Sequence, residues 1–401
     1  MGKLILKRKL ALSASLMLLS LMNAVPTMAD DNPTGFADMR DHWAKKAVAT
    51  AIAKKYVDGY SDGSFRPENY VTGAEFIKMI VTASELKVSG STEGSQWFVP
   101  YIKAAVEKGL VREEAITASF LENPITRLEM SKVAVRSTDP SLQQKHVSLN
   151  DQGVMYTAVN KGLIQGLSGG ELAPEGKTTR AQSVTIVERV LTLNNGEKLP
   201  VDKVAIGQAE LQLKRTNMFS MIPMFTAQQN EGLTWLPEKL TYATPDGKYK
   251  GEIDQVVAID MEDANDPNRH LLGDINELHW FDQTERSGKE MPLVKDYPKS
   301  YVILVKSHTV FNNDTESYPG RYGLGMSFTG FKIPDEKAFH NGTLNTLTSV
   351  FKNRFGDMGA FILPKDGAEA PRGIDIQIFV PAKPPVKDMT HTITSLQTYQ
   401  P

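Results

Sequence analysis

The chain has 401 residues, with 45 lysines and arginines against 47 aspartates and glutamates, a formal net charge of −2 at pH 7, and no cysteine. The near balance of charge argues against nucleic acid as a partner, because phosphate binding calls for a concentrated basic face. The lack of cysteine excludes disulfides, thiol catalysis and cysteine-ligated metals. The length predicts two or three domains.

The first 29 residues predict a secretory signal peptide. A basic start precedes a mostly apolar stretch at 10–25, and Thr27-Met-Ala29 forms a small-x-small cleavage site. The alternative is an uncleaved membrane anchor, but polar residues interrupt the stretch, which is shorter than the roughly 20 apolar residues of a membrane span. We therefore expect cleavage after Ala29 and an exported, soluble protein without membrane contact.

Three similar segments then recur at nearly fixed spacing. They are Thr72-Gly-Ala-Glu75, Thr126-Arg-Leu-Glu129 and Thr179-Arg-Ala-Gln182. Their threonines are 54 and 53 positions apart, and each segment opens an apolar helical run that follows an amphipathic helix pattern and a loop. One such unit has too small a core to be stable alone, so we predict three stacked helix-loop-helix repeats. The predicted repeats lie at 30–83, 84–137 and 138–195.

The Thr-x-x-Glu/Gln pattern predicts a helix N-cap. In a capping box the threonine hydroxyl accepts a hydrogen bond from the N3 amide, and the Glu or Gln side chain accepts one from the N-cap amide. Losing the threonine costs about 1 kcal/mol of helix stability. We expect this structural role for Thr72, Thr126, Thr179, Glu75, Glu129 and Gln182.

Arginine follows the capping threonine in two segments, as Arg127 and Arg180. A cation at this first helical position is disfavoured by roughly 0.3–1 kcal/mol, because the N-terminal end of the helix dipole is positive. Capping does not require arginine, whereas a guanidinium beside free helix amides can hold a carboxylate or phosphate. The alternative is a solvated surface arginine paired with a neighbouring acid, and the residues themselves leave both open.

The first repeat carries the most complete motif. It contains Phe36-Ala-Asp38, His42-Trp43-Ala44, Gly59-Tyr-Ser-Asp-Gly-Ser-Phe-Arg-Pro67 and Val71-Thr-Gly-Ala-Glu75. This pattern resembles the S-layer homology domain, in three tandem copies over about 36–193. The resemblance implies an all-α pseudo-trimer with a central bundle of one helix per repeat. It also implies binding of secondary cell-wall polysaccharide, typically ending in a pyruvylated amino sugar, in grooves between adjacent repeats.

The resemblance assigns candidate polysaccharide-binding residues. The motif arginines are Arg127 and Arg180, which would hold the pyruvyl carboxylate, whereas the first copy has Gly73 at this position. Arg66 in the preceding loop is a candidate substitute, or only a loop surface residue. Asp38 matches the family aspartate, a candidate acceptor for sugar hydroxyls.

Trp43 and Trp97 match the family tryptophan, which either stacks on a sugar ring or fills the core between repeats, and we favour the core. Gly59 and Gly166 match the loop glycine, which allows close backbone approach. Glu113 replaces this glycine in the second copy. Because the copies differ, we expect one or two working grooves rather than three.

After a polar boundary at 194–200, the sequence predicts a β-rich domain over 201–401, sandwich-like, with one or two helices. Strand-favouring segments occur at 256–259, 301–305, 322–333 and 373–380. Pro245-Asp-Gly247 predicts a hairpin turn. We also predict one helix over 335–355, broken near Asn341-Gly342, and an extended, proline-rich tail over 381–401.

The C-terminal half carries only weak candidates for chemistry. Segment 325–330 resembles a nucleophile elbow, but its second glycine is one residue too far away. Glu277, His279 and Asp282 are candidate acid-base or metal ligands, and we favour a polar strand edge instead. The oxygen-rich segment 260–266 lacks the glycine and terminal glutamate of an EF-hand, so we interpret it as a solvated loop. We expect no catalytic residue, cofactor or metal ligand.

These observations predict an exported protein at the cell wall or S-layer surface. Its N-terminal half would anchor it non-covalently to secondary cell-wall polysaccharide. Its C-terminal half would be displayed as a structural or lattice-forming module, or as a binding module. The alternative, ranked behind, is an anchored wall- or glycan-degrading enzyme with its activity in 201–401. Other S-layer or envelope proteins are further candidate partners.

Overall fold

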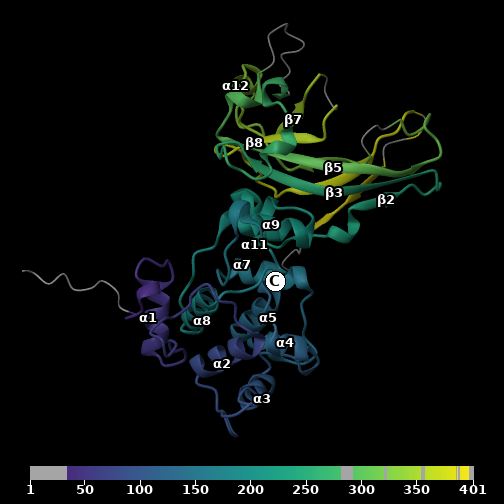
Figure 1. Cartoon of the computed structure of the whole chain (residues 1–401). Helices are drawn as coiled ribbons and strands as arrows, with labels where there is room; N and C mark the ends of the chain where they lie inside the picture. The colour runs from purple at the N-terminus through teal and green to yellow at the C-terminus, as the bar shows by residue number, and fades with distance from the viewer. Residues whose placement is uncertain are drawn as a thin grey trace, which may run out of the picture.

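The computed structural model describes residues 34–280, 292–319, 323–353, 357–384, 386 and 389–396. Its N-terminal half is helical and its C-terminal half contains the β-sheets, as the sequence predicts (Figure 1). The signal peptide predicted for 1–29 lies outside the described residues. No helix in the described ranges is long and apolar enough to cross a membrane.

Short helices and loops build the N-terminal half. In chain order the helices and 3₁₀ turns are η1 (Ala37–Met39), α1 (Lys45–Ala53), α2 (Gly73–Ala83), α3 (Val99–Lys108), η2 (Glu113–Ala115), α4 (Ala118–Glu122), α5 (Arg127–Ser137), α6 (Pro140–Gln143), α7 (Asp151–Asn160), η3 (Ser168–Gly170) and α8 (Arg180–Asn194). Helices α2, α5 and α8 begin directly after the three threonines and form the inner helices. The other helix of each predicted repeat packs on an inner helix of a different repeat, α3 on α2, α7 on α5, and α1 on α8.

A ring of backbone hydrogen bonds joins the starts of the three inner helices. The Val71 amide donates to the Thr178 carbonyl at 3.2 Å, Thr178 donates to Ile125 at 3.0 Å, and Ile125 donates back to Val71 at 2.8 Å. Each of these residues immediately precedes a capping threonine. The cycle therefore places the N-termini of α2, α5 and α8 around one axis, with each helix start beside the loop of another repeat.

Capping boxes begin all three inner helices. At α5 the Thr126 hydroxyl accepts from the Glu129 amide at 3.1 Å, and the Glu129 carboxylate accepts from the Thr126 amide at 2.8 Å. The same reciprocal bonds occur at Thr72 with Glu75 and at Thr179 with Gln182. Four backbone amides at a helix start lack intrahelical partners, and each box satisfies donors that burial would otherwise leave unpaired.

We predict that Thr126→Ala lowers the free energy of unfolding by about 1 kcal/mol, because the Glu129 amide loses its acceptor. Urea denaturation followed by circular dichroism measures the change. Thr126→Ser keeps the hydroxyl and is the matched control. An unchanged denaturation midpoint in the alanine variant would contradict the structural role.

Three helices open the C-terminal half: α9 (Lys203–Lys214), α10 (Met218–Met221) and α11 (Pro223–Asn230). The strands are β1 (Leu233–Trp235), β2 (Thr241–Ala243), β3 (Tyr249–Asp260), β4 (His279–Trp280), β5 (Ser300–Asn312), β6 (Gly325–Thr329), β7 (Thr348–Phe351), β8 (Ala360–Pro364), β9 (Asp375–Val380), β10 (Met389–Thr392) and β11 (Thr394–Leu396). Short helical elements lie between them, namely η4 (Pro237–Lys239), η5 (Arg269–Leu272), η6 (Ile275–Glu277), η8 (Val294–Asp296) and α12 (Glu336–His340).

The described strands form antiparallel sheets. A six-stranded sheet has the order β2-β3-β5-β8-β7-β4, a three-stranded sheet has the order β10-β9-β6, and β1 pairs with β11. Because side chains alternate along a strand, Val256 and Ile303 enter the core shared with β9, whereas Val257 and Val302 enter a second core with Trp280. The large sheet is therefore buried on both faces, by the smaller sheet on one side and by short helices and loops on the other.

Two sequence predictions in this half are wrong. Instead of one helix over 335–355, α12 ends at His340, Gly342 takes a left-handed φ of +90°, and β7 follows on the sheet. The predicted extended tail over 381–401 instead contributes β10 and β11, which pair with β9 and β1. In both places pairing with distant strands outweighs local preference. The hairpin turn at 245–247 is confirmed between β2 and β3.

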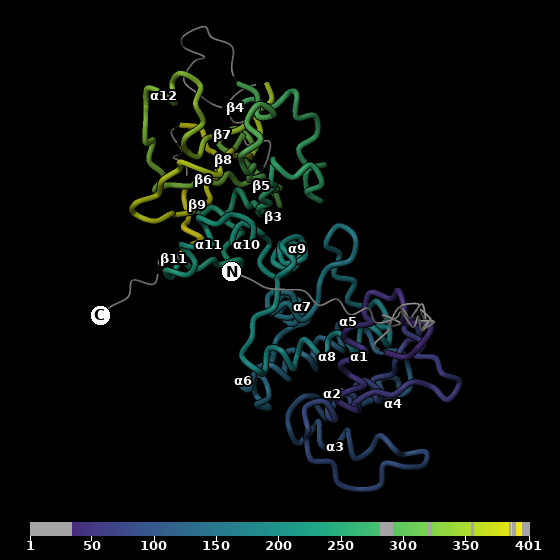
Figure 2. The backbone as a smooth tube through the Cα atoms, turned by 90° about the vertical axis from the view of Figure 1, so that its left-hand side faces the viewer, coloured from purple at the N-terminus to yellow at the C-terminus, as the bar shows by residue number. Residues whose placement is uncertain are grey.

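Helix α9 belongs to both halves (Figure 2). Ala205, Ile206 and Ala209 lie in the core of the N-terminal half, whereas Leu211 lies in a core of the C-terminal half. Its fully buried Glu210 side chain accepts hydrogen bonds from Lys214 at 3.1 Å and from the Ser220 amide. The boundary predicted near 201 thus precedes a helix that ties the two halves together.

Candidate functional site

Arg180 lies at the start of α8, against the loop of the first repeat. Its guanidinium donates to the Asp58 carbonyl and lies over the rings of Tyr60 and Phe65, at 5.2 and 4.7 Å from their centroids. Partial burial lowers the pKa of Arg180, although it stays a cation. Its Nε atom is buried and has no hydrogen-bond partner within the described residues.

A second arginine lies beside the first. Arg66 is over the Tyr60 ring at 4.0 Å, and its guanidinium pairs with the Asp62 carboxylate at 2.7 Å. Hydrogen bonds from Ser64 and Arg66 hold the pKa of Asp62 well below its usual range. Two cations and an aromatic ring therefore share the surface between the 58–66 loop and α8. Tyr60 lies within the loop motif of the first repeat, but it is not among the binding residues predicted from the sequence.

Arg127 occupies the equivalent place at the start of α5 but is enclosed. Its guanidinium donates to the carbonyls of Gln165 and Leu172, both at 2.9 Å, and the residue is only 6% exposed. Gln165 and Asp58 each precede the loop glycine, so the two arginines make the same contact with different loops. Burial lowers the pKa of Arg127. One alternative from the sequence is a solvated surface arginine paired with a neighbouring acid. This interpretation is wrong for Arg127.

The first repeat has neither an arginine nor space for one. A Cβ atom on Gly73 would lie 2.2 Å from the Phe120 carbonyl and 2.9 Å from its ring. Phe120 belongs to α4, and its side chain is buried. The groove between α2 and the loop of the second repeat is therefore filled by this phenylalanine.

We predict that Gly73→Arg lowers the free energy of unfolding by about 1–3 kcal/mol, because the new side chain must displace α4. It should add no wall-binding capacity, although it restores the motif. Thermal denaturation measures the loss, and Ala118→Arg, at an exposed position of α4, is the control. A stable Gly73→Arg protein with tighter wall binding would contradict this account.

The loop glycines Gly59 and Gly166 are packed closely against other parts of the protein. A Cβ atom on Gly59 would meet the Phe36 ring at 2.2 Å, and one on Gly166 would lie 3.0 Å from the Ala205 side chain of α9. The Gly166 amide also donates to the Asp202 carboxylate at 3.1 Å. Asp202 is the N-cap of α9, so this helix covers the loop of the third repeat.

Asp38 supports the loop that carries Arg66. Its carboxylate accepts from the Phe65 amide at 3.1 Å and from the Arg66 amide at 2.7 Å. Trp43 is 62% exposed, because the adjacent Ala44 takes the buried position. The core position predicted for Trp43 is therefore wrong. Trp97 is half-buried and packs edge-on against Phe98 and Tyr101.

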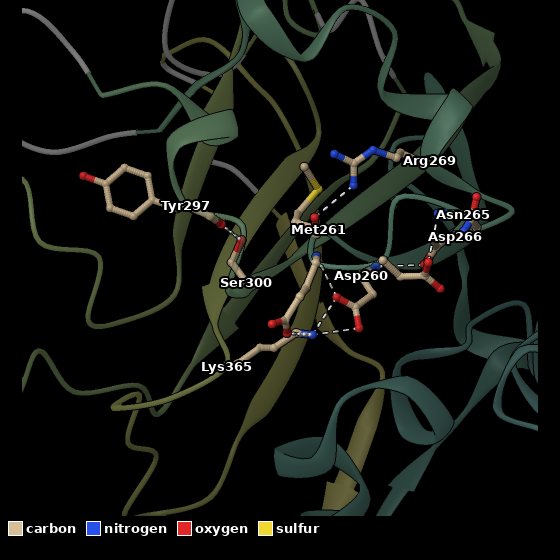
Figure 3. Close-up of polar contacts among 10 residues, drawn as sticks. Asp260, Met261, Asn265, Asp266, Arg269, Tyr297, Ser300 and Lys365 are labelled. Carbon is tan, nitrogen blue, oxygen red and sulfur yellow. Dashed lines mark hydrogen bonds and ion pairs between the residues drawn. The ribbon is translucent and has the colours of Figure 1, made fainter.

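In the C-terminal half, the acidic segment 260–266 makes internal contacts (Figure 3). Asp266 is buried and accepts from the amides of Asp260 and Asn268, and burial raises its pKa. Lys365 pairs with Asp260 at 2.7 Å and with Glu262 at 2.8 Å. Within the described ranges, no group of three or more His, Asp or Glu side chains is arranged to hold a metal ion.

The other candidates for chemistry are also engaged in the fold. Ser327 lies within strand β6, paired with Gln377 of β9, and not on a strand-to-helix elbow. Glu277 pairs with Lys352, and the His279 ring stacks on Phe351. Asp282 lies outside the described residues.

Residues 35–77 and 144–182 match the S-layer homology domain. These two stretches contain Arg66 and Arg180, the paired arginines of the candidate site. The segment that contains α3 to α5 lies between the two matched stretches, and its Ile125 takes part in the ring of backbone hydrogen bonds.

Several curated proteins are similar to the N-terminal part of this chain. The amylopullulanase of Thermoanaerobacterium thermosulfurigenes is 28% identical over 175 residues, or 39% of this chain and 9% of that protein. The surface-layer 125 kDa protein of Lysinibacillus sphaericus is 24% identical over 185 residues, 42% of this chain and 16% of that protein. The cellulosome-anchoring protein of Acetivibrio thermocellus is 40% identical over 50 residues, 12% of this chain and 11% of that protein. The likeness to the amylopullulanase is confined to the S-layer homology part. This chain spans less than a fifth of the length of each of these three relatives.

Proposed function

We propose that this protein is held at the cell-wall surface by its N-terminal half, which binds an anionic secondary cell-wall polysaccharide. The proposed binding site is the surface between the 58–66 loop and the start of α8. The observation that carries the proposal is Arg180, a partly exposed cation at the start of α8 that lies beside the Tyr60 ring. A pyruvyl carboxylate can accept from such a guanidinium in a charge-assisted hydrogen bond.

The neighbouring residues suit a glycan. Tyr60 offers part of its ring next to Arg180, and Tyr70, which is 59% exposed, forms a backbone bridge with Thr179 at the start of the same helix. Aromatic faces beside a few polar groups are a common way to hold sugar rings. The Asp62 carboxylate keeps Arg66 oriented, and Arg66 adds a second positive charge to this surface.

Of the three inner helices, only α8 begins with a motif arginine that is partly exposed, because the chain fills the equivalent position at the other two. Phe120 takes the arginine position next to α2, and α9 covers the loop that faces Arg127. These differences between the copies support a single working site among the three. The sequence predicts one or two working sites, and one is the lower of these numbers. We propose that 84–137 supplies the middle copy.

The C-terminal half is proposed to be the displayed module, with a structural or binding role. Its candidate catalytic residues within the described ranges take part in strand pairing, ion pairs and ring stacking. The glycoside-degrading relatives resemble this chain only in the S-layer homology part, so an enzymatic C-terminal half remains the second candidate.

Cosedimentation of the exported protein with purified cell walls tests the proposal. The protein should pellet with native walls and stay in the supernatant after the pyruvyl groups are removed by mild acid. Equal pelleting with both wall preparations would overturn the proposed ligand chemistry. Failure to pellet with native walls would overturn anchoring itself.

A further inference from the structure

A groove lies on the outer side of the second repeat, away from Arg180. It lies between α3 and the η2–α4 segment, has a volume of about 470 Å³, and has a mostly apolar lining that includes Val99, Ile102, Val106, Ile116 and Leu121. Val99 is 46% exposed. An amphipathic helix can bind by laying its apolar face into a groove of this kind.

The third repeat has the equivalent groove, and the chain fills it with its own helix. Thr126 and Thr179 are 53 positions apart, and the same offset relates Ile102 to Met155 and Val106 to Val159. Met155 and Val159 are fully buried on α7, and α9 packs against both α7 and η3. The fold therefore already shows one helix docked in a groove of this type.

The two grooves differ in depth. In the third repeat, the backbones approach closely, since a Cβ atom on Gly170 would lie 2.6 Å from Val204 of α9. In the second repeat, Thr117 is equivalent to Gly170 and Glu113 to Gly166. A helix docked there must stand further away, so larger apolar side chains, of the size of leucine, are needed to fill the space.

The rim of the groove is acidic. Glu107 and Glu113 line it together with a single cation, Lys103, which already pairs with Glu107 at 3.9 Å. Glu113 has no ion-pair partner among the described residues, and its charge favours a partner with basic residues beside its apolar stripe. A second copy of this chain is a poor occupant, because its α9 is already buried between two cores.

We propose that the α3 groove docks an amphipathic helix of another protein at the cell surface. The helix carries leucine-sized side chains at i, i+3, i+4 and i+7, flanked by lysine or arginine. This surface is independent of the proposed polysaccharide site. It gives the anchored protein a site by which a second polypeptide is held at the wall.

The test uses the exported full chain and two synthetic helices with the same leucine stripe. One helix has lysines beside the stripe and the other has glutamates, and fluorescence anisotropy of labelled peptide measures binding. The lysine helix should bind saturably and at least about tenfold more tightly than the glutamate helix. Val99→Glu should weaken lysine-helix binding by about tenfold or more, because it places a charge in the apolar groove.

Two further variants locate the effect. Val310→Glu is the matched control, since Val310 on β5 is 45% exposed and lies far from the groove in sequence, and it should leave binding unchanged. Glu113→Lys should weaken binding of the lysine helix and strengthen binding of the glutamate helix. The proposal is overturned if neither helix binds saturably, or if Val99→Glu and Val310→Glu bind alike. It is also overturned if sedimentation velocity shows a dimer of the chain that Val99→Glu dissociates, because the groove would then join two copies.

Discussion

Arg180→Ala is expected to weaken wall binding by about 10- to 100-fold while the protein stays folded. A hydrogen bond to a charged group contributes roughly 1.5–3 kcal/mol, and this variant removes the guanidinium at the proposed binding surface. The side chain of the partly exposed Arg180 makes one described hydrogen bond, to the Asp58 carbonyl, so its loss leaves most of the fold intact. Quantitative pelleting over a range of wall concentrations measures the change.

Arg180→Lys is the informative control for this variant. Lysine keeps the positive charge but lacks the planar fork that holds a carboxylate at two points. We expect binding between that of the wild type and that of Arg180→Ala. If Arg180→Ala binds walls as strongly as the wild type, with unchanged circular dichroism, Arg180 has no part in anchoring.

Arg127→Ala is expected to have the opposite profile, a large loss of stability with little direct effect on the ligand. The buried guanidinium holds the Gln165 and Leu172 carbonyls, and alanine leaves both without these donors and opens a cavity. The variant loses two buried hydrogen bonds from a charged group, but it no longer buries a cation. The net loss in the free energy of unfolding is about 2–4 kcal/mol. Urea denaturation should show a lower midpoint.

Below the unfolding transition, the Arg127→Ala protein should still pellet with walls. Native-like circular dichroism and wall binding reduced by tenfold or more would contradict the structural assignment of Arg127. Unchanged stability would contradict it as well. The pair of variants thus separates a ligand-facing arginine from a structural one at the same position of the motif.

The local structure of the N-terminal half can be predicted from the sequence because the Thr-x-x-Glu/Gln segments recur at nearly fixed spacing. The capping threonines, the helix that follows each, and the outer helices all appear in the periodic pattern. The sequence does not separate Arg127 from Arg180, since both occupy the first helical position. Their difference comes from the loops that they face, since Arg127 is enclosed by the Gln165 and Leu172 carbonyls, whereas Arg180 lies over aromatic rings at the surface.

Predictions failed where distant contacts decide the outcome. Its size and apolar character favour a core position for Trp43, but the chain buries the adjacent Ala44 instead and leaves Trp43 62% exposed. The segment 335–355 favours a helix locally, yet Val350 and Phe351 are drawn into the sheet by pairing with β8 and β4. Pairings of this kind join residues far apart in sequence, which local patterns do not report.

Isothermal titration calorimetry of the exported protein with a purified, pyruvylated wall polysaccharide fragment tests the central claim most directly. The account predicts saturable binding with one site per chain, lost when the pyruvyl group is removed and strongly weakened in Arg180→Ala. Two or three equivalent sites per chain, or the same affinity for the fragment without pyruvate, would contradict a single working site centred on Arg180.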